Sequence, residues 1–254
     1  MTTLDFTPAP GAAPLPRMVL AQAAAEARGM LRNGEQLLLT MIIPILVLVA
    51  FSSAPLLRIE GSRIDHVTPG VLALAIMSTA FTGQAIATGF ERRYGVLKRL
   101  GATPLSRPGL MLGKTLAIIG VEVVQVVVIS AVAAGLGWRP GGGFASAALL
   151  VLLGTAAFSG LGLLMAGTLR AEATLAAANL VYLVLLGVGG VVFPVERFPQ
   201  GVQGVLELLP ITALSGGLRS VLSGAGGFPA AQALILLAWA VLGLALAARF
   251  FRWE

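Results

Sequence analysis

The chain has 254 residues, of which 57% are hydrophobic and only 11% carry a charge, and its mean hydropathy is +0.93. Soluble domains carry about 25% charged residues, so this composition excludes an ordinary soluble domain and predicts an all-α polytopic membrane protein. The net charge of +6 fits basic loops on the inner side of a membrane better than nucleic-acid binding. Because the chain has no cysteine, it also lacks disulfides, thiolate nucleophiles and cysteine-based metal sites.

The N-terminal region precedes the first long apolar run. Residues 1–16 are rich in proline and lack the pattern of a signal peptide, so we expect a disordered tail. In residues 17–36, small and apolar side chains gather opposite Glu26, Arg28 and Arg32. This pattern predicts an amphipathic helix that lies on the membrane interface. A helical extension of the first span into water is the alternative.

Six segments are long and apolar enough to cross a hydrocarbon core of about 30 Å, which takes about 20 helical residues. They are residues 37–57, 67–90, 115–137, 144–169, 173–193 and 230–248. With six spans, twelve Lys and Arg residues fall on the side of the N-terminus and five on the other. The positive-inside rule therefore predicts that both termini are cytoplasmic. Fifteen Arg against two Lys is typical of GC-rich bacterial genes, so we expect a bacterial plasma membrane.

Residues 91–114 form a polar loop between the second and third spans and carry six of the seventeen Lys and Arg residues. In a helix over residues 91–100, the apolar side chains share one arc, and most of the charged ones lie opposite. Gly101 and Pro104 end this helix. A solvated inner loop needs only the charge, whereas the apolar arc, Tyr94 and the sharp stop favour a surface that docks on another protein.

The segment 109–115, GLMLGKT, ends like a phosphate-binding loop. It has three residues instead of four before the Gly-Lys pair, and Pro108 stands where the first glycine is required. No strand is expected before it, and the third span follows at once. We therefore interpret Lys114 as a side chain that snorkels to the inner interface, and the sequence has no visible ATPase.

Glu122 is the only acidic residue well inside a predicted span, about 10 Å beyond Thr115. Ionisable groups at such depth face a cavity or a polar partner. Glu122 is therefore interpreted as a substrate or cation contact or as a structural hydrogen-bonding group, with a proton relay as a third reading. The candidate pathway residues are Glu122, Gln125, Thr82, Asn179 and Tyr182. His66 lies far from any ligand set, so we expect no metal site and no catalytic residue.

Residues 194–224 are too apolar for a solvated linker and too broken by proline and glycine for one spanning helix. Two short helices that enter the outer leaflet and return, forming an external re-entrant hairpin, satisfy both features. A pair of helices resting on the headgroups is the alternative. The candidate hairpin residues are Phe193, Pro194, Phe198, Pro199 and Pro210.

The segment 91–104, ERRYGVLKRLGATP, resembles the E-x-x-x-G-x-L-x-x-L-x-x-x-P loop of ABC transporter permeases of the type-2 export class. The expected interfacial helix, six spans and hairpin agree with that family. The resemblance implies one permease domain over 17–254, which dimerises and is driven by a separate ABC ATPase that binds ATP and Mg. The coupling residues it implies are Glu91, Arg92, Arg93, Tyr94, Gly95, Leu97, Lys98, Arg99 and Leu100.

From these features we expect the membrane subunit of an ATP-driven exporter, paired with an identical or different second permease. The low intramembrane charge favours a drug-like amphiphile or a lipid, and the aromatic content of 6% disfavours a polysaccharide groove. A secondary transporter that uses Glu122 as a cation or proton site is the alternative, although inverted halves are not visible. A third hypothesis is a membrane scaffold that transports nothing. It does not explain the hairpin or the polar residues within the spans.

Overall fold

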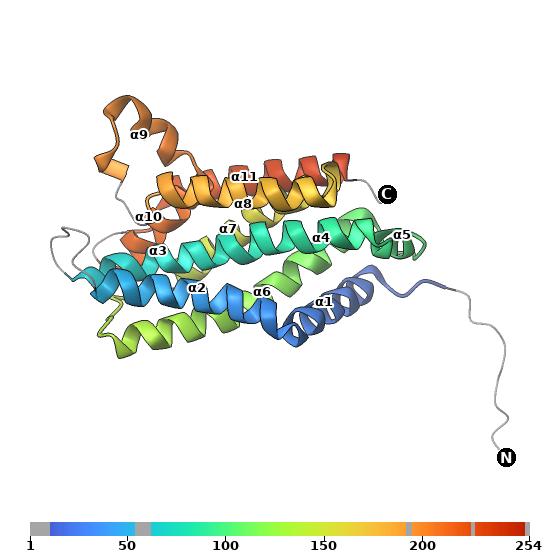
Figure 1. Ribbon diagram of the computed structural model, residues 1–254, viewed down its shortest axis with the longest axis horizontal. Coiled ribbons are helices and arrows are strands. Elements are labelled where there is room, and N and C mark those ends of the chain that lie inside the picture. Colours follow the sequence, from blue (N-terminus) through green and yellow to red (C-terminus); the bar gives the residue numbers. More distant parts are fainter. Residues whose placement is uncertain (1–10, 54–61, 192–194, 225–226, 252–254) are drawn as a thin grey trace, which may run out of the picture.

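The computed structural model of the chain describes residues 11–53, 62–191, 195–224 and 227–251, with only the backbone at 35–39 and 196. Every regular element in these ranges is a helix, which confirms the predicted all-α class (Figure 1). In chain order the helices are α1 (Leu15–Arg32), α2 (Gly34–Ser53), α3 (Arg63–Met77), the π-helix η1 (Ser78–Gly83), α4 (Gln84–Arg93), α5 (Val96–Gly101), α6 (Arg107–Gly135), α7 (Phe144–Thr168), α8 (Ala171–Val188), the 3-10 helix η2 (Val195–Arg197), α9 (Gln200–Glu207), α10 (Pro210–Leu222) and α11 (Ala230–Phe250).

Five stretches of the described chain are long and apolar enough to cross a membrane: the continuous α3–η1–α4 stretch Arg63–Arg93, α6, α7, α8 and α11. The helices α9 and α10 form a pair bent by 85°, which makes a sixth crossing if the pair acts as one span. The expected first span corresponds to α2, within which Thr40–Ser53 is an apolar helical stretch, and residues 54–57 of that expected span lie outside the described residues. The protein is therefore a multi-pass membrane protein with five to six span candidates.

The helices form one elongated bundle with two distinct ends (Figure 1). The start of α1, the short helix α5 and the end of α11 lie together at one end, which we term the α5 end. The helices α9 and α10 lie at the opposite end. Helix α1 begins at Leu15, within the segment expected as a disordered tail, and residues 1–10 of that tail lie outside the described residues.

Helix α7 runs through the bundle and packs closely on two sides through glycines. A Cβ atom on Gly160 would lie 2.6 Å from the backbone nitrogen of Leu244 in α11. A Cβ on Gly162 would lie 2.8 Å from the carbonyl oxygen of Phe81 in η1. Small residues that let backbones approach are a main source of helix association in membranes, so these two glycines set the distances between α7, α11 and the second span.

The bent pair is held to the bundle by its inner helix. Helix α10 is almost wholly buried and packs against α3, α7 and α11, whereas α9 projects from the bundle (Figure 1). Arg219 of α10 donates to the carbonyl oxygens of His66 (3.4 Å) and Gly190 (3.2 Å), near the start of α3 and the end of α8. Trp239 of α11 donates to the carbonyl oxygen of Leu208 at the bend, at 2.8 Å. The backbone of α10 is thus shielded by protein, as an inserted hairpin requires.

The candidate hairpin residues fall at the element boundaries of this pair. Phe193 and Pro194 lie outside the described residues. Phe198 is half-buried beside the start of the pair, Pro199 directly precedes α9, and Pro210 is the first residue of α10. Proline is tolerated in the first helical turn because the N–H it lacks has no helical partner there.

The contact at Gly160 yields a test of the packing. We expect Gly160→Leu to force α7 and α11 apart and to destabilise the protein by at least about 1–3 kcal/mol, as overpacking does. The matched control is Gly120→Leu on α6, where a Cβ would meet no atom within 4 Å. Thermal unfolding in detergent should show a lowered midpoint for the first variant alone, and equal midpoints would contradict the assigned contact.

Candidate functional site

The basic loop over residues 91–114 is mostly helical, with breaks at residues 94–95 and 102–106. Helix α4 extends the second span through Arg93, the chain turns at Tyr94 and Gly95, and α5 begins at Val96. Gly95 has φ +72°, a left-handed conformation that glycine adopts without the penalty of a side chain. The structure thus divides the continuous helix expected over residues 91–100 into α4 and α5, which the turn at Tyr94 and Gly95 separates.

This division separates the loop residues into exposed and buried sets. Tyr94 is 66% exposed, and Lys98 and Arg99 are also exposed. Leu97 is fully buried and Leu100 half-buried. The cluster that encloses Leu97 comprises Val19, Leu105, Leu110, Met111, Leu163, Ala247 and Phe251. Helix α5 is therefore anchored against α1, α6, α7 and the end of α11, while its other face is open.

Two arginines at the end of α4 hold the neighbouring helix corner. Arg92 donates to the carbonyl oxygens of Ala166 at 2.9 Å and Leu169 at 2.8 Å, at the C-terminal end of α7. These carbonyls have no partner within their own helix, so Arg92 caps α7. Arg93 forms an exposed ion pair with Glu172 in the first turn of α8. The end of the second span is thus fastened to the α7–α8 corner.

A buried ion triad joins three helices at the α5 end. The Nζ atom of Lys114 in α6 lies 2.7 Å from Oε1 of Glu26 in α1 and 2.6 Å from Oε2 of Glu91 in α4. The side chain of Lys114 is 4% exposed, that of Glu26 13% and that of Glu91 24%. Gln22 supports the triad by donating to Glu26 at 2.8 Å. The expectation that Lys114 snorkels to the interface is therefore corrected, because the two carboxylates compensate its charge inside the protein.

Glycines on α6 bring α1 close enough to complete this triad. A Cβ on Gly113 would lie 3.1 Å from Cγ of Gln22 and 3.3 Å from the carbonyl oxygen of Val19. One turn earlier, a Cβ on Gly109 would lie 3.2 Å from Cδ1 of Leu15. The Gly-Lys sequence that resembled a phosphate-binding loop thus serves helix packing and ion pairing between α1, α4 and α6.

Deeper in the bundle, polar side chains connect α6 to its neighbours. The hydrogen bonds are Thr79 to Gln125 (3.0 Å), Gln125 to the carbonyl oxygen of Thr40 (2.8 Å), Thr115 with Ser159 (2.8 Å), Ser159 to Gln84 (2.7 Å) and Thr155 to Glu122. Such contacts between spans replace the water that these groups would otherwise need. The polar residues of the second, third and fourth spans therefore form an interhelical network.

The predicted pathway residues fall into two groups. Glu122 and Gln125 are buried on α6 within this network. Thr82 lies on η1, and Asn179 and Tyr182 lie on α8, which packs against α4, η1 and α7. Asn179 is exposed and donates within its own helix to Leu175, and Tyr182 is half-buried against the main core. The structure does not bring the α8 residues to Glu122.

Glu26, Thr155 and Ser159 are interaction partners that sequence reasoning missed. Glu26 is recognisable from the sequence only as part of a polar face of α1. Thr155 and Ser159 lie one turn apart on α7 and have no local signal beyond being polar residues in an apolar run. Their roles depend on which helices meet in space, and helical periodicity alone carries no such information.

The triad makes a charge-specific prediction. Lys114→Gln leaves two carboxylates facing each other, and removing one partner from a buried ion pair costs about 3–5 kcal/mol. The double exchange Glu91→Lys with Lys114→Glu again gives one ammonium and two carboxylates, with the ammonium now on α4 beside the carboxylate on α6, and should recover part of the stability lost in Lys114→Glu. Lys98→Gln on the exposed face is the control. Midpoints of thermal unfolding in detergent test the order, and a double variant no more stable than Lys114→Glu alone would refute the triad.

Comparison with known proteins identifies the family of the chain. A sequence model of the ABC-2 type transporter family matches residues 19–223. No curated protein sequence matches the chain. The matched range begins within α1 and ends just after α10, so it contains the basic loop, the ion triad and the bent helix pair. Because the match covers most of the chain, the protein belongs to the ABC-2 type transporter family and is a membrane-spanning permease of that family.

Proposed function

We propose that this permease exports a hydrophobic or amphiphilic molecule and is driven by an ABC ATPase that docks on the exposed face of the α4–α5 turn. The observation that carries the proposal is the division of one short loop into an exposed set, Tyr94, Lys98 and Arg99, and an inward set, half-buried Glu91 and buried Leu97. A coupling element needs both kinds of residue, because it must contact a partner and also transmit force into the spans. ATP and Mg would bind in the partner ATPase and not in this chain.

The proposed orientation places the α5 end in the cytoplasm. The loops predicted on this side carry most of the Lys and Arg residues, and such loops are retained inside. The start of α1 and the end of α11 lie at the same end as α5 (Figure 1). Both termini would then be cytoplasmic, and the membrane would be the plasma membrane of a bacterium. The bent pair α9–α10 would face the exterior.

The attachments of the loop supply a route for the motion. Displacement of α5 would act through Leu97 on α1, α6, α7 and α11. The ion triad would move α1 together with α4 and α6, and Arg92 would carry the α7–α8 corner. Because packed helices shift as units between discrete arrangements, we propose that ATP-driven closure of the partner rearranges these spans and opens a path beside α10.

The composition of the spans favours a hydrophobic or amphiphilic substrate. Thr82, Asn179, Tyr182, Gln125 and Glu122 are candidate contacts along the path, and they present few charges for a strongly ionic solute. A drug-like amphiphile or a lipid fits better.

The apolar side chains of α8 are largely exposed, which supports a second permease copy packed beside this helix. That copy could be identical or different.

The docking face yields the main test. We expect the triple variant Tyr94→Ala, Lys98→Glu, Arg99→Glu to weaken binding of the ATPase by about 30-fold or more, because hot-spot residues contribute about 2 kcal/mol or more. The permease should still fold, since these side chains are exposed. The measurement is copurification of the ATPase with tagged permease and the permease-stimulated rate of ATP hydrolysis.

Arg139→Glu is the matched control, because Arg139 is exposed in the α6–α7 connection at the other end of the bundle. Unchanged copurification and unchanged ATP hydrolysis in the triple variant would contradict docking at α5. The secondary transporter would instead be supported by three results together. Transport would resist vanadate, it would persist without an ATPase, and it would be lost on Glu122→Gln.

A further inference from the structure

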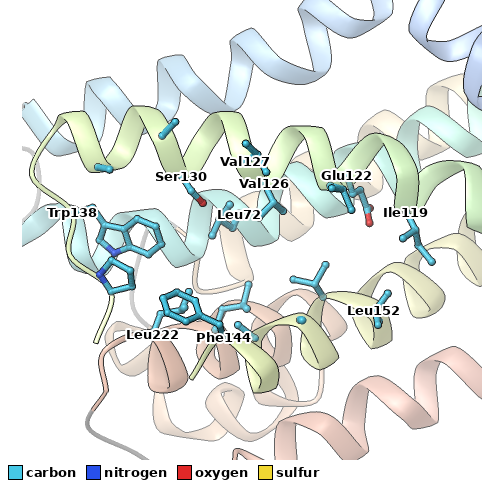
Figure 2. Close-up of a pocket in the computed structure, with 18 residues that line it drawn as sticks. Leu72, Ile119, Glu122, Val126, Val127, Ser130, Trp138, Phe144, Leu152 and Leu222 are labelled. Carbon is cyan, nitrogen blue, oxygen red and sulfur yellow. The ribbon is translucent and has the colours of Figure 1, made fainter. Parts of the chain in front are cut away.

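A cavity of about 630 Å³ lies between α6 and α7, apart from the α5 end and from the residues on α8 (Figure 2). Its walls come from α3, α6, α7, α10 and the connection between α6 and α7. Val126, Leu152, Leu218 and Phe144 are typical of its lining, which is almost entirely apolar. Ligand sites in proteins are commonly about 300–1,000 Å³ and mostly apolar, so both the size and the lining suit a small hydrophobic molecule.

The cavity is reachable from the side of the bundle. Val127 on α6 is 62% exposed and Phe144 on α7 is 65% exposed, although both contribute to the lining. Both helices are long and apolar enough to cross a membrane. A molecule dissolved in the hydrocarbon layer could therefore enter between these helices without passing through water.

One end of the cavity holds a carboxyl group with unused hydrogen-bonding capacity. Glu122 is 2% exposed, and its Oε2 accepts a hydrogen bond from Thr155 of α7. Its Oε1 is buried and has no hydrogen-bond partner among the described residues. Figure 2 shows this side chain directed into the space between α6 and α7. A buried polar atom without a partner is costly, and a bound donor would satisfy it.

The other residues of the lining define the charge and the shape of a ligand that would fit the cavity. Within the described chain, none of the residues that line the cavity is Lys, Arg or His, so Glu122 has no basic neighbour in the lining. Trp138 lines the far end just after α6, whose last residue Gly135 lies about 20 Å along the helix from Glu122. The cavity is thus mostly apolar, with the carboxyl group of Glu122 at one end, the hydroxyl group of Ser130 between the ends and an aromatic ring at the other end.

We propose that this cavity binds an elongated lipophilic amine. Its ammonium group donates to Oε1 of Glu122, and its apolar body lies between α6 and α7 toward Trp138 and Phe144. The amine headgroup of a phospholipid fits less well, because it carries a phosphate that would meet no basic residue of the lining. Binding needs this chain alone, and only the step from bound ligand to exported substrate rests on the proposed function.

The test is equilibrium binding of tritiated dodecylamine to the full-length permease in phosphatidylcholine nanodiscs, with empty nanodiscs subtracted. Glu122→Gln should weaken binding at least about 10-fold, because it replaces a charge-assisted hydrogen bond by a neutral one. Glu207→Gln on α9 is the matched control, since this carboxylate is exposed and does not line the cavity. Equal affinities of Glu122→Gln and the unaltered protein would overturn the proposal.

A second variant separates the cavity from the carboxylate. Ala148→Trp fills the cavity from the α7 side while leaving Glu122 in place, and it should weaken binding of both dodecylamine and dodecanol. Glu122→Gln should affect the amine far more than the alcohol. Amine binding unaffected by Ala148→Trp would also overturn the proposal. Displacement of the amine by added phosphatidylethanolamine would identify a lipid headgroup as the occupant and so reject a free amine.

The amine site and the proposed export function can fail independently of each other. Amine binding that depends on Glu122, in a permease that recruits no ATPase, would retain the site and reject the exporter. Normal ATPase coupling through Tyr94, Lys98 and Arg99 with no amine binding would retain the exporter and reject the site.

Discussion

The arrangement at the α5 end depends on one buried ammonium group. Lys114 needs two carboxylates because an uncompensated charge in this position would be severely unfavourable. Glu26 and Glu91 come from different helices, so satisfying Lys114 requires α1, α4 and α6 to meet at one point. Gly113 lies at that meeting point, where even a Cβ would be only 3.1 Å from Cγ of Gln22 and 3.3 Å from the carbonyl oxygen of Val19 in α1. A helix too polar to span the membrane is thereby fixed to two helices of the spanning bundle.

The basic loop is also attached to the bundle by side chains along its length, so that a displacement of the loop would be transmitted to the spans. A loop attached only through its two chain ends could move without affecting the bundle. Here Leu97 is enclosed by apolar side chains of four other segments, and Arg92 caps α7. The turn at Tyr94 and Gly95 separates α4 from α5, and a second non-helical stretch over residues 102–106 separates α5 from α6. The exposed residues are therefore displayed on a support that connects directly to most of the bundle.

Among the described residues of the bundle, several polar groups hold helices together, and Glu122 is one of those that keep a buried polar atom without a hydrogen-bond partner. Gln125 and Ser159 each make hydrogen bonds to two other helices. Glu122 makes one such contact and retains a buried oxygen beside an apolar cavity. The difference between these side chains is one of surroundings, because all of them are polar residues in apolar runs.

Much of the fold was predictable from the sequence, because crossing a hydrocarbon layer demands long apolar helices and because proline and glycine interrupt them. The apolar runs, the bent pair before α11 and the family of the chain belong to this part. The partner of Lys114, the division of the loop at Gly95 and the position of Glu122 beside a cavity were not predictable. They depend on which helix faces meet, and local periodicity describes each face without saying what it will contact. Only the tertiary structure places Glu26 beside Glu91, since nothing in the spacing of two residues on separate helices determines their distance.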